Sequence, residues 1–263
     1  METQQRTRWT LTGKKALVTG GTKGIGAAVA EELCALGAEV FVAARSAPDV
    51  RSRVEEWTSR GWQSGGMASD VADAHAREAL IARVAQRWGK LDILVNNAGT
   101  NIRKKTPAYT DQEADLVMRT NLTSAFDLCR RAYPLLKSAG GACIVNVASV
   151  GGITALGTGT PYAMSKAALL QMTRTLAAEW GADGIRVNAV APWYIRTPLA
   201  EPVLNRADYL AAVIARTPLG RVGEPEEIAA AVAFLSMDAA SYITGTCLPV
   251  DGGFLASGFT PPP

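Results

Sequence analysis

The stretch Thr19-Gly-Gly-Thr-Lys-Gly-Ile-Gly26 decides the fold. An apolar run at residues 15–19 leads into it, and a helical pattern at residues 25–36 follows it. A strand, a glycine turn and a helix N-terminus together make an anion site, because the first helical turn presents free N–H groups and the positive end of the helix dipole. The stretch therefore predicts a dinucleotide-binding loop at the end of the first strand.

The three spaced glycines of this loop have different roles. Gly20 permits the tight turn, Gly24 lets the backbone approach a pyrophosphate, and Gly26 allows the helix to pack closely on the strand. The spacing G-x₃-G-x-G differs from the common G-x-G-x-x-G fingerprint. Taken alone, the loop is therefore also compatible with a glycine-rich turn that binds nothing.

Apolar runs alternate with helical patterns along the chain. Runs such as residues 143–147, Cys-Ile-Val-Asn-Val, lack the alternation of a half-solvated sheet, which indicates parallel strands covered by helices. We therefore predict a single α/β domain over residues 1–263, a Rossmann-type doubly wound parallel sheet with helices on both faces. The expected strands are 15–19, 40–44, 93–96, 143–148, 186–190 and 247–250, and the expected helices are 25–36, 74–88, 111–137, 161–180 and 226–237.

Two parts of the chain depart from this alternation. Residues 192–218 interrupt the rhythm of strands and helices, and we expect them to form a lid over the substrate. The ends, about residues 1–8 and 259–263, are expected to be disordered. Because ligands of such sheets bind beyond the carboxyl ends of the strands, the site is expected there.

The composition excludes several classes of protein. The 263 residues carry 27 Lys and Arg against 24 Asp and Glu, and a net charge of +3 is too small to indicate a nucleic-acid partner. The single histidine, His75, is expected on the surface and leaves no Ser/His/Asp triad and no histidine-rich metal site. We expect no metal.

The chain also lacks the signals of a membrane or secreted protein. No run approaches 18 uncharged apolar residues, and residues 1–9 have no apolar signal-peptide core. The cysteines form no C-x-x-C motif and lie among apolar neighbours, which is typical of buried free thiols in a reducing compartment. We therefore expect a soluble, cytoplasmic protein without a membrane partner. The cysteines are Cys34, Cys129, Cys143 and Cys247.

The end of the second expected strand indicates which dinucleotide binds. In NAD-binding chains an acidic side chain about twenty residues after the glycine loop bonds the ribose 2′-hydroxyl. Here the strand ends in Val42-Ala-Ala-Arg-Ser, with Arg45 and no carboxylate. Arg45, with Lys23 able to approach the same ribose, suits a 2′-phosphate. We expect NADP(H) rather than NAD(H), unless Arg45 is only a solvated residue at the strand end.

Tyr162 and Lys166 are spaced i, i+4 and share a helix face. A phenol with an ordinary pKa of about 10 is a poor base at neutral pH, but an adjacent ammonium, aided by an oxidised nicotinamide, lowers that pKa. Ser149, after another expected strand, can donate a second hydrogen bond to the same substrate oxygen. The pair predicts a general acid/base for an alcohol or ketone, although Tyr-x-x-x-Lys alone also occurs on helices without catalysis.

In order and spacing, these residues resemble the classical short-chain dehydrogenase/reductase family, from Leu11 to about Phe254. Within the family, three stretches of this chain resemble the tropinone-reductase-like branch. They are the glycine loop, the Gly-Thr-Asn-Ile-Arg stretch after the fourth strand, and Ala-Pro-Trp. The family pattern is T-G-x₃-G-x-G, N-N-A-G, a helix Asn, and a Ser about a dozen residues before Y-x-x-x-K. The matching positions are residues 19–26, residues 96–99, Asn121, Ser149, Tyr162 and Lys166.

The resemblance implies reversible reduction of a ketone to a secondary alcohol by hydride transfer. Tyr162 would protonate the carbonyl oxygen, and Ser149 would orient it. Lys166 would hold the nicotinamide ribose and lower the pKa of Tyr162, and Asn121 would support a water that relays protons. A dinucleotide-binding protein without catalysis would keep the glycine loop, but such proteins usually lose the tyrosine or the lysine, and both are present.

The resemblance also implies the cofactor contacts. Asp70 and Val71, at the end of a third strand, would contact adenine, although Asp70 would also suit a helix N-cap. Ile195 and Thr197 would meet the carboxamide. The residues expected at the cofactor are Gly20, Thr22, Lys23, Gly24, Ile25, Gly26, Arg45, Asp70, Val71, Asn97, Ala98, Gly99, Tyr162, Lys166, Pro192, Ile195 and Thr197.

One position departs from the family pattern. Where the family usually has Pro-Gly after the sixth strand, this chain has Pro192-Trp-Tyr-Ile-Arg-Thr197, with a large ring near the nicotinamide. Trp193 is expected either to pack under the lid or to contact the substrate. We include it, with Ser149 and Tyr162, among the expected substrate-binding residues.

The expected lid is apolar, which favours a small cyclic or aryl ketone as the substrate. Family members that act on sugar acids or acyl-carrier thioesters place basic residues at the mouth of the site, and four basic residues stand in comparable stretches here. A keto sugar acid, as in gluconate-type dehydrogenases, is therefore the second candidate, and a 3-oxoacyl thioester is the third. The same residues also suit a solvated basic rim. They are Arg103, Lys104, Lys105 and Arg196.

The helix that carries Tyr162 is apolar over more than one face. Members of the family commonly form tetramers through this helix and the one after Asn121. Burial against both the sheet and a neighbouring subunit would explain the pattern, so we expect a homotetramer. The apolar residues are Ala167, Ala168, Leu169, Leu170, Met172, Leu176 and Ala177.

Overall fold

One sheet of seven parallel strands runs through residues 8–258, the part of the chain that the computed structural model describes. The strand order is β3-β2-β1-β4-β5-β6-β7, so the direction of winding reverses between β1 and β4. This confirms the predicted Rossmann-type doubly wound sheet. The strands are β1 (Lys15–Thr19), β2 (Glu39–Ala44), β3 (Ser64–Ala68), β4 (Ile93–Asn96), β5 (Ala142–Val147), β6 (Ile185–Pro192) and β7 (Cys247–Val250).

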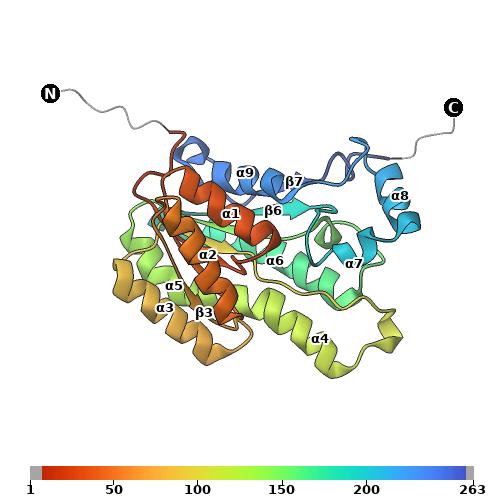
Figure 1. The fold of residues 1–263 in the computed structure, drawn as a ribbon, viewed down its shortest axis with the longest axis horizontal. Coiled ribbons are helices and arrows are strands. Elements are labelled where there is room, and N and C mark those ends of the chain that lie inside the picture. The colour runs from red at the N-terminus through yellow and green to blue at the C-terminus, as the bar shows by residue number, and fades with distance from the viewer. Residues whose placement is uncertain (1–7, 259–263) are drawn as a thin grey trace.

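Helices cover both faces of the sheet (Figure 1). On one face lie α1 (Gly24–Ala35), α2 (Ala47–Ser59) and α9 (Pro225–Ser236). On the other face lie α3 (Ala74–Trp88), α5 (Ser124–Ser138) and α6 (Thr160–Trp180), with α4 (Asp111–Met118) beside α6. Two short helices, α7 (Glu201–Leu204) and α8 (Ala207–Ala215), stand at one end of the molecule, within the predicted lid.

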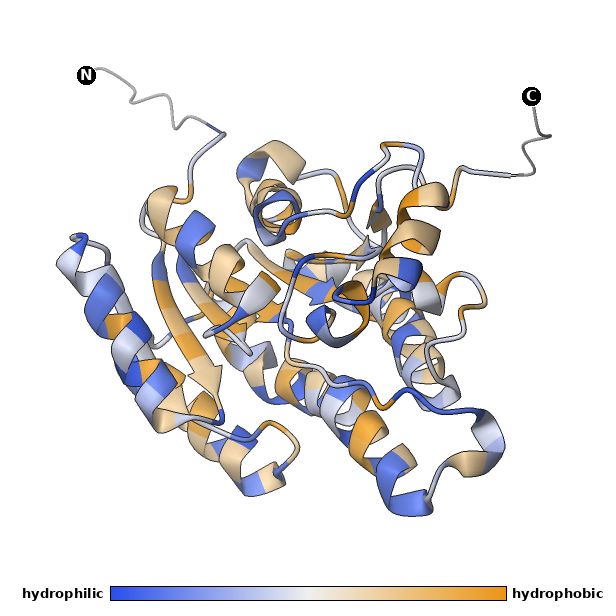
Figure 2. Cartoon of the chain, turned by 45° about the vertical axis from the view of Figure 1, so that its right-hand side comes forward, coloured by the Kyte–Doolittle hydropathy of each residue, from blue (hydrophilic) through white to orange (hydrophobic). Residues whose placement is uncertain are grey.

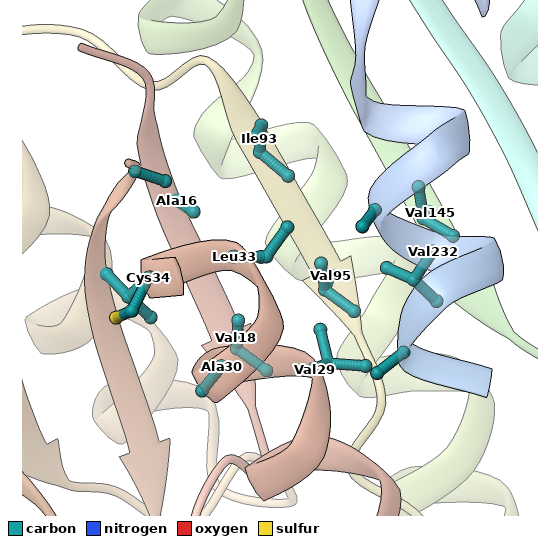
Figure 3. Close-up of a cluster of buried hydrophobic side chains, with 14 of the residues drawn as sticks. Ala16, Val18, Val29, Ala30, Leu33, Cys34, Ile93, Val95, Val145 and Val232 are labelled. Atoms are coloured by element: carbon teal, nitrogen blue, oxygen red, sulfur yellow. The ribbon is translucent and has the colours of Figure 1, made fainter. Parts of the chain in front are cut away.

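The strands are apolar on both faces because both faces are covered. In β1, Ala16 and Val18 belong to the core cluster under α1 and α9, whereas Leu17 belongs to the cluster under α3 and α5. Figure 3 shows Val29 and Leu33 of α1 pointing between the strands in the first cluster. In Figure 2 the strands are mostly apolar and the helices alternate between apolar and hydrophilic residues. The absence of alternation in the strands was therefore a correct indicator of a two-sided sheet.

Outside the lid, whose helices α7 and α8 were not predicted, the apolar pattern misses two elements, β3 and α2. The sequence of β3 is Ser-Gly-Gly-Met-Ala, and its glycines let α2 pack closely, since a Cβ on Gly66 would lie 2.6 Å from Val50 Cγ1. Only Val50 and Trp57 are buried along α2. Small residues in the strand and few apolar ones in the helix left no periodicity to detect, and the family resemblance alone indicated a third strand.

The thiols and the histidine lie close to expectation. Cys34, Cys129 and Cys143 are buried free thiols, but Cys247 is only half-buried. Burial raises the pKa of all four thiols, which makes them poor nucleophiles. His75 is exposed in the first turn of α3.

Two expectations concern the ends of the chain and the membrane. The predicted disorder of residues 1–7 and 259–263 lies outside the described residues, whereas Arg8 lies in a turn and its carbonyl accepts a hydrogen bond from Ala239 N. Between residues 8 and 258 no helix is both long enough and apolar enough to cross a bilayer.

Candidate active site

A cavity of about 800 Å³ lies at the carboxyl ends of the strands, where the winding reverses. All the predicted cofactor-binding and substrate-binding residues line it, from the glycine loop through Arg45 and Asp70 to Trp193 and Thr197. Of the four predicted catalytic residues, Ser149, Tyr162 and Lys166 line the cavity. Asn121 is buried behind its wall.

The glycine loop has the geometry that the sequence predicts. Gly20 has a φ of +65°, a conformation that disfavours other residues. A Cβ on Gly26 would lie 2.2 Å from Gly20 O, so only glycine lets α1 start this close to the loop. No side chain caps the N-terminus of α1, which leaves its first N–H groups facing the cavity.

Thr19 and Asn97 connect the glycine loop to the end of β4. Thr19 Oγ1 accepts hydrogen bonds from the backbone N–H groups of Asn97 and Ala98, each at 3.1 Å. The amide of Asn97 donates to Thr19 O at 2.9 Å and to Gly20 O at 3.2 Å. The side chain of Asn97 therefore fixes the loop, and sequence reasoning missed this role of Thr19.

Arg45 and Lys23, the two cations expected near the adenosine ribose of the cofactor, differ in their ion pairing. Arg45 lines the cavity and makes no ion pair among the described residues, but Lys23 Nζ lies 2.7 Å from Asp49 Oδ2. Lys23 holds the pKa of the Asp49 carboxyl below its ordinary value. An anion at this end would therefore meet Arg45 as an unpaired cation and Lys23 as one already shared with Asp49.

Asp70 is not a helix N-cap. Its carboxylate accepts from Ala72 N at 3.0 Å in a turn after β3, and the N-cap of α3 is Asp73, which accepts from Ala76 N at 2.7 Å. Asp70 is exposed at the edge of the cavity, and Val71 is buried beside it. The reading of Asp70 as a cap is therefore wrong.

The helix expected over residues 111–137 is broken at Asn121. The segment consists of α4, a π-helical turn η2 (Arg119–Thr123) and α5. In this turn, Asn121 Oδ1 accepts from Thr100 N at 2.8 Å, and Asn121 Nδ2 donates to Thr100 O at 2.9 Å and to Ser165 Oγ at 3.1 Å. Wide turns of this kind occur at functional sites. Here the turn lets one amide connect β4, α4 and α6.

Lys166 is buried, and its Nζ donates to Val147 O at 2.7 Å. Burial lowers the pKa of Lys166 to about 8. A Cβ on Gly99 would lie 3.6 Å from this Nζ, so the ammonium lies next to the loop after β4. Lys166 Nζ also lies 5.8 Å from the centroid of the Tyr162 ring.

Tyr162 differs from the expectation in one respect. Burial raises the pKa of Tyr162, and the hydrogen bond from Ser149 and the charge of Arg103 only partly offset this effect. Lys166 is not among the groups that lower it, and its Nζ donates instead to Val147 O. The raised pKa keeps the phenol protonated at neutral pH, which is the form that donates a proton to a carbonyl oxygen.

Ser149 lies two residues after the end of β5, with its side chain near Tyr162. Ser149 Oγ accepts from Gly151 N at 3.0 Å, which leaves its own proton available as a donor. The structure therefore brings a hydroxyl donor, a half-buried phenol and a buried ammonium to one wall of the cavity. That arrangement can bind the oxygen of a ketone or alcohol and exchange a proton with it.

Trp193 is packed between the lid and the C-terminal segment. Its ring stacks on Phe254 with centroids 3.7 Å apart, and its Nε1 donates to Thr217 Oγ1 at 3.1 Å. Tyr194 packs against the edge of the same ring and bonds the hydroxyl of Tyr209 in α8. Trp193 also lines the cavity. It therefore holds the lid in place through these contacts and presents part of its ring to the cavity.

Two loop residues near Tyr162 carry no motif and were missed. Asn101 and Thr158 line the cavity, and each has a buried side-chain oxygen. Arg103, expected only as one of four basic residues, also lines it. A polar side chain in a loop gives no periodic signal, so only the fold reveals that these residues meet.

Comparison with known proteins agrees with this geometry. A family model described as enoyl-(acyl carrier protein) reductase matches residues 20–255. A tropinone reductase homolog of Arabidopsis thaliana is 49% identical over 261 residues, 99% of this chain and 98% of that protein. A second such homolog from the same plant, named chloroplastic, is 49% identical over 97% of this chain and 79% of its own length.

Solved structures share the whole fold. A gluconate 5-dehydrogenase from Burkholderia cenocepacia, in complex with NADP and tartrate, superposes with a TM-score of 0.92. It is 31% identical in sequence, and the match covers 95% of this chain and 98% of that one.

Proposed function

Because the chain belongs to the short-chain dehydrogenase/reductase family, in its tropinone-reductase-like branch, we propose that it reduces a ketone reversibly to a secondary alcohol with NADP(H). One observation carries the proposal. Ser149, Tyr162 and Lys166 line the same cavity as the uncapped glycine loop, so a proton donor and a phosphate site share one space.

The residues present fit a dinucleotide. The first turn of α1 and the loop glycines would hold the pyrophosphate, since no side chain caps the N-terminus of α1 and Gly20, Gly24 and Gly26 all line the cavity. Asp70 and Val71 would contact adenine, and Ile195 and Thr197 would meet the carboxamide. When bound, the nicotinamide supplies or accepts the hydride.

Proton transfer is the part of the reaction that we assign to this chain's own residues. Tyr162 donates its phenolic proton to the ketone oxygen, and its raised pKa keeps that proton in place until the oxygen becomes basic. Ser149 donates a second hydrogen bond and stabilises the developing charge. Lys166 and Asn121 hold the ribose and a relay water, with Asn121 fixed by Thr100 and Ser165.

We propose NADP(H) over NAD(H) because Arg45 faces the adenosine end without an ion pair among the described residues. Asp49 opposes this preference, since its carboxylate lies close to Lys23 and would repel a 2′-phosphate. The test is steady-state kinetics with both cofactors. Wild type should have a higher kcat/KM for NADPH, and Arg45→Ala should lower that value by about tenfold or more while changing the value for NADH little. A kcat/KM for NADH equal to that for NADPH would contradict the preference.

For the substrate, we propose a small cyclic or aryl ketone, because apolar residues form the lid side of the cavity. A keto sugar acid is the second candidate, favoured by Arg103 in the cavity wall. A 3-oxoacyl thioester is the third. Oxidation of NADPH measured over these three classes of substrate separates the candidates. The apolar wall comprises Leu116, Leu156, Trp193, Tyr194, Pro198 and Leu199.

We also propose a homotetramer in a reducing compartment such as the cytoplasm. On α5 and α6, the helices through which members of the family commonly form tetramers, Phe126 is 51% exposed and Met164 54% exposed. The free thiols agree with a reducing compartment. Light scattering at micromolar concentration should give four times the mass of the chain.

A further inference from the structure

A buried ion pair joins α3 to α5. The two helices lie side by side (Figure 1), and Arg77 Nε of α3 lies 2.7 Å from Asp127 Oδ2 of α5. Arg77 is only 5% exposed and Asp127 7% exposed. Apolar residues of similar volume often stabilise a fold as well as a buried ion pair does, because both charges of the pair must leave water. The stability of the fold is therefore a weak reason for placing this pair here.

The other end of the guanidinium bonds the turn that follows β3. Arg77 Nη1 donates to Val71 O at 2.7 Å, and both residues are buried. Val71 lines the cavity together with its neighbours Asp70 and Ala72, at the end where the adenosine of the cofactor would lie. Asp70 bonds along the turn, where it accepts from the N–H groups of Ala72 and Asp73. Arg77 connects this turn to a second helix, α5.

Three arginines hold the carboxylate of Asp127 in place. Besides Arg77, Arg131 Nε donates to Asp127 Oδ2 at 2.9 Å, and Arg130 Nη2 donates to Asp127 Oδ1 at 2.6 Å. Burial raises the pKa of Asp127, but the hydrogen bonds from the three arginines outweigh burial and hold that pKa well below its ordinary value. The carboxylate is therefore charged at neutral pH and is a fixed anchor for Arg77.

Arg77 and Asp127 are separate from the groups that we assign to proton transfer. Neither residue lines the cavity. Ser149 and Lys166 do line it, and they bond to the segment after β5 and to β5 itself. A change at Arg77 would therefore reach a bound dinucleotide through the turn that contains Val71, and not through the reacting groups.

We propose that Arg77 is a positioning residue for the adenosine half of the dinucleotide. Anchored by Asp127, it fixes the carbonyl of Val71 and so holds Asp70 and Val71 where they contact adenine. A guanidinium suits this task, since its planar fork donates to a carboxylate and to a carbonyl at the same time. The inference rests on the proposed use of a dinucleotide, and it adds a residue of α5 to those that support cofactor binding.

The test measures binding of the adenosine half by itself. Titration calorimetry with the purified full chain gives the Kd for 2′,5′-ADP, which lacks the nicotinamide, and the Kd for NADPH. Arg77→Met should raise both Kd values by about tenfold, because it removes a hydrogen bond from a charged donor to the turn. Arg83→Met is the matched control on α3, since Arg83 is exposed and bonds Gln86. The control should leave both Kd values unchanged.

A more conservative variant keeps the charge beside Asp127. Arg77→Lys retains the ion pair but lacks the planar fork, so its Kd values should lie between those of wild type and Arg77→Met. If Arg77→Met does not fold, Arg77→Lys decides the question by comparison with wild type. Binding of 2′,5′-ADP to Arg77→Lys as tight as to wild type would then overturn the inference.

Kinetics distinguish positioning from a general loss of structure. Arg77→Met should raise the KM for NADPH by about tenfold and change kcat little. With reduced nicotinamide mononucleotide, which has no adenosine, the variant should reduce a ketone at the wild-type rate. Equal Kd values for wild type and Arg77→Met, or the same loss of activity with the mononucleotide as with NADPH, would overturn the inference and leave the proposed reductase standing.

The wild-type protein tests the proposed function separately. If it binds NADH and not NADPH, then NADH and 5′-AMP replace the two ligands, and the same comparison of variants decides the role of Arg77. A wild-type protein that binds no dinucleotide would refute the proposed function, and the inference about Arg77 with it.

Discussion

The inner and outer walls of the cavity differ in how their polar groups are bonded. The inner wall, which we define as Ser149, Tyr162 and Lys166 with Asn121 buried behind them, is bonded to the backbone: Asn121 to Thr100, Ser149 to Gly151 and Lys166 to Val147. In the outer wall, defined as Asn101, Arg103, Thr158 and Trp193, three side chains have buried atoms without partners within the described residues. The polar groups of the inner wall are bonded within the protein, whereas three atoms of the outer wall are not.

We assign the reaction to the inner wall and the recognition of the substrate to the outer wall. Internal hydrogen bonds set the geometry of the inner wall before any ketone arrives, so the same proton donor can serve many substrates. The outer wall contributes charge and hydrogen bonds that only some ketones can use. Changes to the inner wall should therefore affect turnover with every substrate, and changes to the outer wall should affect the choice among substrates.

Replacing Tyr162 with Phe should have the largest effect, because it removes the proposed proton donor. We expect kcat to fall by about 10²–10⁴-fold with every ketone that wild type reduces. The affinity for NADPH, measured by fluorescence titration, should change little. Turnover at the wild-type rate would show that proton transfer does not depend on this phenol.

Replacing Lys166 with Met should stabilise the fold at neutral pH. The ordinary pKa of the lysine, 10.5, falls to about 8 on burial, so keeping it charged in the folded state costs stability below pH 8. Between pH 8 and 10.5 the unfolded chain binds more protons than the folded chain, so wild-type stability rises with pH. In urea titrations we expect the variant to be more stable by about 2 kcal/mol at pH 7, net of the lost bond to Val147.

That advantage should shrink as the pH rises from 8 to 10.5. A difference that stays constant over this range would mean that the pKa of Lys166 is not lowered by folding. We also expect the same variant to lose activity. The buried ammonium would then lower the stability of the fold and be kept because the reaction needs it.

Replacing Phe254 with Leu should loosen the lid through its anchor. The stack between Phe254 and Trp193 is lost, and aromatic pairs contribute about 1 kcal/mol beyond their buried area. We expect KM to rise by roughly threefold to fivefold with all substrates, with a smaller change in kcat. A selective effect on one class of substrate alone would assign this contact to the outer wall and not to the lid.

Glu39 lies outside both walls, and its replacement should have the smallest effect. It shows how a carboxylate away from the cavity changes the stability of the fold in acid. Its carboxylate bonds Lys15 and Arg87, and its pKa is lowered from 4.5 to about 2. A lowered carboxyl pKa stabilises the fold above pH 4.5, and this contribution is lost as the pH falls toward 2. Glu39→Gln should lower Tm by about 2–4 °C at pH 7 and by less at pH 2.5. Equal losses at both pH values would contradict the shift.

The sequence predicted the inner wall better than the outer wall for a physical reason. The glycine loop, Ser149 and the Tyr162–Lys166 pair act through fixed spacing, which a single chain displays directly. Asn101 and Thr158 are 57 residues apart in numbering and meet only because two loops touch. The π-helical turn at Asn121 was also hidden, since its sequence, Arg-Thr-Asn-Leu-Thr, contains no glycine or proline that would mark a change in the helix.

Hydride transfer from NADPH to a carbonyl carbon is the central claim, and isotope transfer tests it most directly. The full chain is incubated with a cyclic ketone and NADPH deuterated at both C4 positions, and the alcohol is analysed by mass spectrometry and NMR. The account predicts one deuterium on the carbinol carbon for each NADPH oxidised, with the hydroxyl proton drawn from Tyr162 and solvent. NADPH oxidation that leaves no deuterium in the alcohol, or tight NADPH binding without turnover of any ketone, would contradict it.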